Sequence, residues 1–315
     1  MRALRAGGLV AFPTETVYGL GADATDPAAV AKIFAAKGRP STNPLIVHVA
    51  DLETARRYAA EWNDAAQTLA AVWWPGPLAI VLRKNPAIVD AATAGRDTVA
   101  LRVPDHPLAL RLLRDFGGPV AAPSANKSNH VSPTTAHHVH DEFGDAVDVV
   151  LDGGPCSVGI ESTVVDLTGK RPVILRPGGV PRRKVEAIVG PVDVFAGATD
   201  PSDAAASPGQ HATHYAPRTP AIRFETSQRG LIRPNAPDGT PNGVVVVGTM
   251  TDSIKKWGPI VAMPREPGLY AHHFYAVLRE VDAMGLREIF IEVPPARPEW
   301  EAVRDRIVRA TRALE

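Results

Sequence analysis

The sequence contains one cysteine, few lysines and no long apolar run. Because Cys156 is the single cysteine among 315 residues, no disulfide can form within the chain, which fits a reducing compartment. No base is visible beside it in the sequence, so we do not expect a catalytic cysteine. The first apolar residues, in MRALRAGGLVAF, form too short a run for a signal peptide, and no segment approaches the ~20 apolar residues of a membrane span. We therefore expect a cytoplasmic protein that does not enter a membrane.

An excess of charge of either sign is also missing. The 34 basic and 34 acidic side chains cancel, so no global field draws the protein to nucleic acid or to an anionic membrane. Any tRNA contact would come from a local patch and would be weak. The 45% hydrophobic content is that of a globular protein, and the length suffices for two domains.

The apolar patterns predict two α/β domains joined by a linker. Over residues 1–190, short apolar runs alternate with amphipathic helical windows. Residues 191–209 lose this periodicity and fill with Ala, Asp, Ser, Pro and Gly, as linkers do, so we expect a linker over 191–217. Residues 218–315 contain the buried strand pattern GVVVVGT and predict a small open α/β sheet. The expected strands of the first domain are 9–12, 45–49, 78–82, 98–103, 120–122, 149–151, 163–167 and 173–175. In the second domain we expect helices over 269–284 and 299–313, a strand at IFIEV and an irregular loop over 225–242.

Two helices carry clear end signals. Asp26 and Pro27 begin one helix, which Gly38 ends. Ser132 followed by Pro133 predicts the start of another, with Ser132 as its N-cap.

The first polar motif is FPTETVYGLGADA. A strand ends at Pro13, so Thr14, Glu15 and Thr16 are expected at its carboxyl end, where ligands commonly bind in α/β sheets. Gly19 and Gly21 are a weak signal, because two such glycines more often mark a turn with positive φ than a phosphate-binding loop.

The second motif, KGRPSTNPLIVHV, brings two cations to one helix end. Lys37 and Arg39 either neutralise the negative end of the helix or contribute to a triphosphate site. In the strand that follows, alternation places Leu45 and Val47 on one face and His48 on the other. His48 is then either a packed core histidine or a donor to a substrate.

The third motif, TVALRVP, places an arginine on an inward face. Thr98 and Arg102 share one face of this strand, while Val99 and Leu101 share the other. A buried arginine is costly unless an anion meets it. That anion is either an internal Asp or Glu, or a substrate carboxylate held by two parallel hydrogen bonds.

Two further motifs supply hydroxyls, an amide and a third cation. In APSANKSNHVSPTT, Ser124 and Asn126 follow a strand, and the helix expected after Ser132 would offer free N–H groups to phosphate. In GIESTVVD and ILRPGG, Ser162 precedes one strand and Arg176 ends the next. The histidines of AHHVH lack a third ligand, so we expect a solvated helix surface and no protein-bound metal.

These stretches, in this order, resemble a known family. PTETVYGLG, KGRPSTNPL, ALRVP, PSAN with SPT, and GIESTVVD with LRPG are similar to the catalytic domain of the threonylcarbamoyl-AMP synthases. SPGQHATHYAP resembles the longer, two-domain Sua5 branch of that family. The family usually continues the PSAN loop with Ser-Gly, whereas this chain has KSNH. The resemblance implies a twisted, largely enclosed mixed sheet, followed by a small open, Rossmann-like α/β domain.

The resemblance also implies roles for individual residues. It places threonine at Thr16, His48, Arg102, Ala122 and Ser162. It places ATP at Lys37, Arg39, Asn43, Thr98, Ser124, Ser132, Arg176 and Tyr215. The residues expected to act in the reaction are Lys37, Arg39, Ser124 and Asn126. The segment over 191–217, which contains Tyr215 near its end, is expected to act as a lid.

The implied reaction joins L-threonine, bicarbonate or CO2, and ATP into threonylcarbamoyl-AMP and pyrophosphate, with Mg²⁺ accompanying ATP. A tRNA threonylcarbamoyltransferase would take the product. Two alternatives remain open. A double-stranded RNA-binding module would bind with steep salt dependence. A carbamoyl-adenylate enzyme of hydrogenase maturation would lack SPGQHATHYAP and would not need threonine.

Overall fold

The chain folds into two compact α/β units. The computed structural model describes residues 1–195, 197, 205–209, 214–233, 235–249 and 258–314. The first unit comprises residues 1–128 and 132–212, and the second comprises 129–131 and 213–315. The boundaries 1–190, 191–217 and 218–315 that we expect from the sequence stay predictions. Part of the expected lid, at 196, 198–204 and 210–213, lies outside the described residues.

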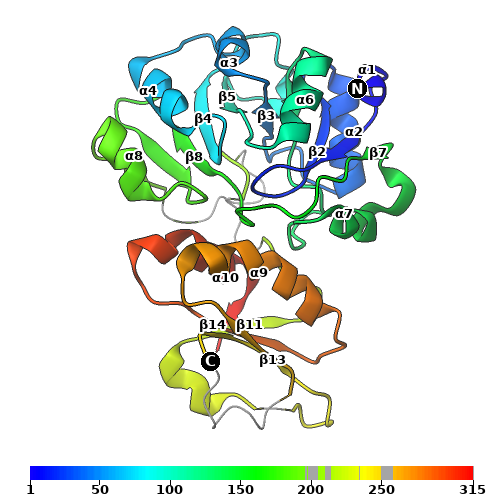
Figure 1. Cartoon of the computed structure of the whole chain (residues 1–315), viewed down its shortest axis with the longest axis vertical. Helices are drawn as coiled ribbons and strands as arrows, with labels where there is room; N and C mark the ends of the chain where they lie inside the picture. Colours follow the sequence, from blue (N-terminus) through cyan, green and yellow to red (C-terminus); the bar gives the residue numbers. More distant parts are fainter. Residues whose placement is uncertain (196, 198–204, 210–213, 234, 250–257, 315) are drawn as a thin grey trace. The chain divides into compact units, whose positions relative to one another are not determined.

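A mixed ten-stranded sheet forms the first unit (Figure 1). Its strand order is β10-β9-β8-β4-β5-β3-β6-β2-β1-β7, with parallel pairs such as β3 and β5 beside antiparallel pairs such as β4 and β5. The strands are β1 (Val10–Phe12), β2 (Gly19–Asp23), β3 (Ile46–His48), β4 (Leu78–Arg83), β5 (Thr98–Arg102), β6 (Val120–Ala121), β7 (Val149–Val150), β8 (Thr163–Asp166), β9 (Val173–Arg176) and β10 (Asp193–Val194). The helices are α1 (Arg2–Arg5), α2 (Pro27–Lys37), α3 (Leu52–Tyr58), α4 (Asp64–Trp73), α5 (Asp90–Thr93), α6 (Pro107–Phe116), α7 (Ala136–Phe143) and α8 (Arg182–Val189), with the 3-10 turn η1 (Gly144–Ala146).

The two faces of this sheet have different partners. Val47 and Leu101 belong to a large apolar core that includes Ile33 of α2, Leu69 of α4 and Val185 of α8. The opposite face carries a smaller cluster, made of Ile46, Ala79, Val81, Ala100, Val164 and Leu175, against which Phe195 and Ala206 pack. Because side chains alternate along a strand, His48 and Arg102 lie on this second face. The alternation expected for β3 and β5 is thus confirmed.

The glycines of the first motif lie in a strand. Gly19 and Gly21 belong to β2, and neither has a positive φ. A Cβ at Gly21 would lie 2.7 Å from a ring carbon of Phe12, which belongs to the paired strand β1. The expectation of a turn was therefore wrong, and these glycines serve close packing between strands.

The predicted helix starts had different outcomes. Asp26 caps α2 by accepting from the amide of Ala28, as expected. Ser132 does not cap α7, because Thr135 takes that position and accepts from the amide of His138. The prediction of free helix amides at Ser132 was therefore wrong.

The second unit is a parallel five-stranded sheet in the order β13-β12-β14-β11-β15. Its strands are β11 (Ala221–Phe224), β12 (Gly243–Val247), β13 (Ile260–Met263), β14 (Ile289–Glu292) and β15 (Arg312–Ala313). Its helices are α9 (Pro267–Asp282) and α10 (Glu301–Ala310), with 3-10 turns η2 (Thr226–Leu231) and η3 (Pro298–Trp300). The closing helix ends earlier than expected, since residues 312–313 pair with β11. The region expected to be irregular contains η2. Among the described residues, none of the helices has the length and apolar character that spanning a bilayer requires.

Candidate active site

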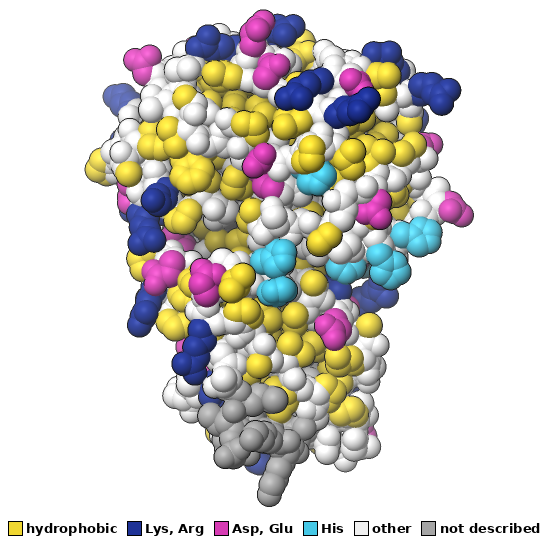
Figure 2. Space-filling view, in the orientation of Figure 1, with side chains coloured by type: hydrophobic (Ala, Val, Ile, Leu, Met, Phe, Trp, Pro, Cys, Tyr) yellow, Lys and Arg dark blue, Asp and Glu magenta, His cyan; other side chains and the backbone are white. Residues whose placement is uncertain are grey.

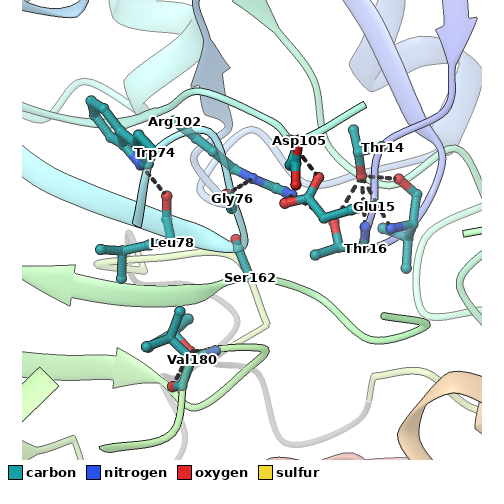
Figure 3. A network of polar contacts seen from close by, with 12 residues as sticks. Thr14, Glu15, Thr16, Trp74, Gly76, Leu78, Arg102, Asp105, Ser162 and Val180 are labelled. Atoms are coloured by element: carbon teal, nitrogen blue, oxygen red, sulfur yellow. Dashed lines mark hydrogen bonds and ion pairs between the residues drawn. The ribbon is translucent and has the colours of Figure 1, made fainter. Parts of the chain in front are cut away.

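Arg102 anchors a buried polar network at the end of β5 (Figure 3). Its Nη2 donates to Glu15 Oε1 at 2.7 Å and to Thr16 Oγ1 at 2.9 Å. Its Nε donates to the carbonyl of Gly76 at 3.3 Å. The other oxygen of Glu15 accepts from the amide of Asp105 at 3.0 Å. An internal carboxylate therefore compensates the buried charge, which is one of the two alternatives expected for this arginine.

One end of the same guanidinium remains available. Among the described residues, Nη1 of Arg102 makes no hydrogen bond, since the three contacts of this side chain use Nε and Nη2. A guanidinium has five N–H donors in a planar fork. Glu15 and Thr16 thus fix the orientation of Arg102 while leaving two donors for a ligand.

His48 lies beside Arg102 on the neighbouring strand, with the two residues in register. The ring is buried and meets Phe12 edge to face, with centroids 5.9 Å apart. Burial lowers the pKa of His48 well below its usual range, and the charge of Arg102 lowers it further. The imidazole is therefore neutral near pH 7, and its Nδ1 has no hydrogen-bond partner among the described residues.

Lys37 holds the loop that follows β6. Its buried ammonium donates to the carbonyl of Ser124 at 2.6 Å and to that of Asn126. Burial lowers the pKa of Lys37 well below its usual range, Arg39 and Lys127 lower it further, and Glu142 opposes them. The ammonium thus meets two carbonyls and has two cations and one carboxylate nearby, and the two cations favour binding of an anion.

The end of α2 does not need the Lys37 side chain. Gly38 adopts the left-handed conformation, with φ of 60°, and the amides of Gly38 and Arg39 donate to Ala35 and Phe34. This backbone cap satisfies carbonyls of the last turn. The Lys37 ammonium lies in the last turn but donates to carbonyls of the loop after β6 and not to those of α2.

Arg39, Asn43 and Thr98 lie near the start of β3 and β5. Arg39 is buried and donates to the carbonyls of Asn43 and Pro44 at 3.2 and 3.0 Å. Asn43 is also buried, and its Oδ1 has no partner within the described part of the chain. Thr98 and Pro44 line a hollow together with Pro208. Thr98 thus lines the same hollow as Pro44, whose carbonyl accepts from Arg39.

Arg176 and Ser162 are joined directly. The guanidinium donates through Nε and Nη2 to the Ser162 carbonyl at 3.2 and 2.9 Å, and through Nη2 to its hydroxyl at 3.2 Å. Ser132 donates to Glu161 Oε1 at 2.6 Å. Glu161 was not among the expected site residues, although it adjoins Ser162 in its motif. Glu15 was expected at the ligand-binding end of its strand but without the role of partner to Arg102.

Tyr215 belongs to the second unit. It is buried there with φ of 64°, stacks on Tyr275 with centroids 5.8 Å apart, and lies 4.8 Å below the guanidinium carbon of Arg306. Its contact with nucleotide stays a prediction. All other expected site residues, Ala122 included, belong to the first unit.

Several other groups bear on the chemistry. Burial raises the pKa of the Cys156 thiol to about 12, so this side chain stays protonated. No group of three or more His, Cys, Asp or Glu able to hold a metal occurs in the described part of the chain. On the face shown in Figure 2, basic side chains are interspersed with acidic and apolar ones over the described residues. That face therefore offers no continuous basic surface for an RNA duplex.

Fold and site together define an α/β protein whose mixed sheet and adjoining loops carry several buried cationic groups. The family model Sua5_yciO_yrdC, described as "Telomere recombination", matches residues 2–178. A second model, "Threonylcarbamoyl-AMP synthase, C-terminal domain", matches residues 180–311. The chain belongs to the threonylcarbamoyl-AMP synthase family, in its two-domain Sua5 form.

Relatives and solved structures agree with this assignment. The threonylcarbamoyl-AMP synthase of Pyrococcus abyssi is 40% identical over 98% of this chain and 92% of its own length. That of Bacillus subtilis is 49% identical over 71% of this chain, an alignment that spans 65% of the relative. The crystal structure of Pyrococcus abyssi Sua5 complexed with L-threonine superimposes with a TM-score of 0.91 at 37% identity, covering 100% of this chain and 94% of that one.

Proposed function

We infer that the chain is an L-threonylcarbamoyladenylate synthase, which forms threonylcarbamoyl-AMP and pyrophosphate from L-threonine, bicarbonate or CO2, and ATP. Relatives that cover nearly the whole chain carry this name, and one solved relative holds L-threonine. The observation that carries the inference is the shared sheet face. It bears an oriented arginine, Arg102, beside a neutral His48. Arg176 pairs across a register shift with Val164, which belongs to the apolar cluster of the same face.

We propose that threonine binds with its carboxylate at Nη1 of Arg102. Glu15 neutralises the arginine and sets its direction, so the substrate need not reorganise it. Thr16, His48, Ala122 and Ser162 complete the proposed threonine site. The neutral imidazole of His48 adds no charge beside the amine, which must be unprotonated to attack CO2.

ATP is proposed to bind along the cationic groups. Lys37, Arg39 and Arg176 would bear the phosphates, with contacts from Asn43, Thr98, Ser124, Asn126, Ser132 and Tyr215. The amine of threonine attacks CO2 and loses a proton to solvent, which gives a carbamate, and a carbamate oxygen then attacks the α-phosphate. The bond from that phosphorus to the bridging oxygen breaks, and pyrophosphate leaves. The cations stabilise the charge that develops on the phosphates.

Mg²⁺ is proposed to enter with the nucleotide, so the phosphate oxygens would supply much of its coordination. The mixed anhydride product is hydrolytically labile, so we further propose a cytoplasmic tRNA threonylcarbamoyltransferase as its acceptor.

The decisive experiment measures pyrophosphate release from ATP with bicarbonate, in the presence and absence of L-threonine. We expect release that depends on both threonine and bicarbonate. Release without threonine would favour simple ATP hydrolysis and contradict the proposal. Salt-sensitive binding of double-stranded RNA without any release would favour the alternative module instead.

A further inference from the structure

A three-residue part of the PSAN loop belongs to the C-terminal unit. Residues 129–131 cluster with residues 213–315, whereas the chain on both sides belongs to the first unit. The loop is thus divided between the two units, with residues 129–131 as its middle segment. Asn126 and Ser132, which we propose as nucleotide contacts, lie on either side of this middle segment. The following inference rests on that proposed function.

The loop residues on both sides of this middle segment are hydrogen-bonded within the first unit. On one side the Lys37 ammonium holds the carbonyls of Ser124 and Asn126, and the amide of Ser128 donates to the Lys37 carbonyl at 2.8 Å. On the other side Ser132 donates to Glu161. The three residues between, 129–131, are assigned by their contacts to the second unit.

The second unit supplies the missing contacts. The amide of Ala216 donates to the Asn129 carbonyl at 2.8 Å, and His130 forms a parallel bridge with Ala216. Nη2 of Arg279 donates to the carbonyl of Val131, whose side chain is buried. Asn129 has φ of 68°, a left-handed conformation that asparagine tolerates better than most residues.

One face of α9 organises these contacts. Tyr275 and Arg279 are four residues apart, so they lie on the same side of the helix, one turn from each other. Tyr275 stacks on Tyr215, next to Ala216, while Arg279 reaches the residue that precedes Ser132. The helix therefore holds the two paired segments, 129–131 and 215–216, together.

We propose that Arg279 is a positioning residue for the nucleotide site: by holding the Val131 carbonyl it preorganises the loop that presents Asn126 and Ser132 to ATP. Without this bond, the loop would have to be ordered when the nucleotide binds, and that entropy would weaken binding. Threonine binding at Arg102 does not use this loop and should not change.

The test compares Arg279→Ala with Arg304→Ala in the full-length protein. Arg304 is a matched control, because it also donates to a backbone carbonyl of the same unit, that of Pro294, outside residues 129–131 and 214–216. We expect Arg279→Ala to weaken binding of a non-hydrolysable ATP analogue about tenfold, as loss of one charge-assisted hydrogen bond allows. Threonine affinity should stay unchanged, Arg279→Lys should restore part of the affinity, and Arg304→Ala should bind the analogue as the parent does.

Hydrogen exchange over residues 126–133 supplies a readout independent of turnover. It should accelerate in Arg279→Ala and not in Arg304→Ala. Unchanged analogue affinity in Arg279→Ala, or equal losses in both variants, would overturn the proposal. Because both measurements need only binding, a parent protein that binds the analogue but releases no pyrophosphate would refute the proposed function and still leave this inference testable. A second pair of variants tests the conformation of the loop at Asn129. Asn129→Gly should keep the affinity for the ATP analogue, whereas Asn129→Val, which disfavours positive φ, should lower it.

Discussion

Arg102 and Glu15 form a buried ion pair, 2.7 Å from Nη2 to Oε1, with both side chains about 5% exposed or less. Such a pair gives little net stability, because desolvation of both charges offsets their attraction. It does orient the guanidinium, since Glu15 is itself held by the amide of Asp105. Its role in this site is therefore to direct the free end of Arg102.

The first prediction concerns threonine recognition at that free end. We expect Arg102→Ala to abolish measurable threonine binding, because truncating one partner of a buried charged contact costs roughly 2 to 5 kcal/mol. ATP lacks a carboxylate, so its affinity should persist. Calorimetric titration with each ligand measures both effects. To avoid leaving the Glu15 charge buried and unpaired, the same titration in the double variant Arg102→Ala with Glu15→Gln serves as control. Intact threonine affinity in both variants would remove Arg102 from the site.

The second prediction separates stability from nucleotide binding at Lys37. Lys37→Met keeps the aliphatic stem but removes an ammonium that burial, Arg39 and Lys127 destabilise and that Glu142 stabilises. We therefore expect the melting temperature to change little, while the apparent KM for ATP rises by about tenfold or more, as loss of a phosphate contact implies. Thermal unfolding and pyrophosphate release test the two halves separately. If the melting temperature and the rate of pyrophosphate release fall together, Lys37 acts through loop stability alone.

The third prediction is a pH dependence that originates at His48. The pKa of His48 is lowered in the folded protein. As the pH falls below about 6.5, the unfolded chain therefore takes up a proton at this residue while the folded chain stays neutral there. Stability from this group is therefore present above that pH and is lost as pH falls, by up to about 1.4 kcal/mol per pH unit. Comparing unfolding at pH 7.5 and 5.5, we expect His48→Gln to lose less stability than the parent. Equal losses would show that His48 is charged when folded.

Local patterns predicted the face of each site strand but not its partners. The alternation in β3 and β5 placed His48 and Arg102 together, because the period of a strand depends only on the backbone. Glu15 is 87 residues from Arg102 in the chain, so their pairing depends on strand order, which the sequence does not reveal. The cap of α7 was misassigned because Ser132 and Thr135 are both good N-caps, and the contact of Ser132 with Glu161 decides between them.

The fourth prediction concerns Gly178, which follows β9 and packs against the chain that enters β8. A Cβ at this position would come within 2.4 Å of the Glu161 carbonyl oxygen and of the Ser162 carbonyl carbon. These backbone atoms belong to the residues just before β8, where Arg176 donates to the Ser162 carbonyl. They therefore cannot move away without a cost in stability. Overpacking of this kind typically costs 1 to 3 kcal/mol, and we expect Gly178→Ala to cost ~3 kcal/mol.

Gly169→Ala is the matched control, because the nearest atom to its Cβ would be 3.6 Å away, an ordinary contact, and its φ is not positive. Melting curves should separate the two alanine variants by several degrees. Arg176 donates a hydrogen bond to the Ser162 carbonyl, next to which the new Cβ of Gly178→Ala would lie. We therefore expect the substitution to affect ligand binding as well as stability. At a temperature where Gly178→Ala is still folded, both threonine and ATP affinity should fall, since Ser162 is assigned to one site and Arg176 to the other. A destabilised variant that binds both ligands normally would show that the Ser162–Arg176 contact supports the fold and not the site.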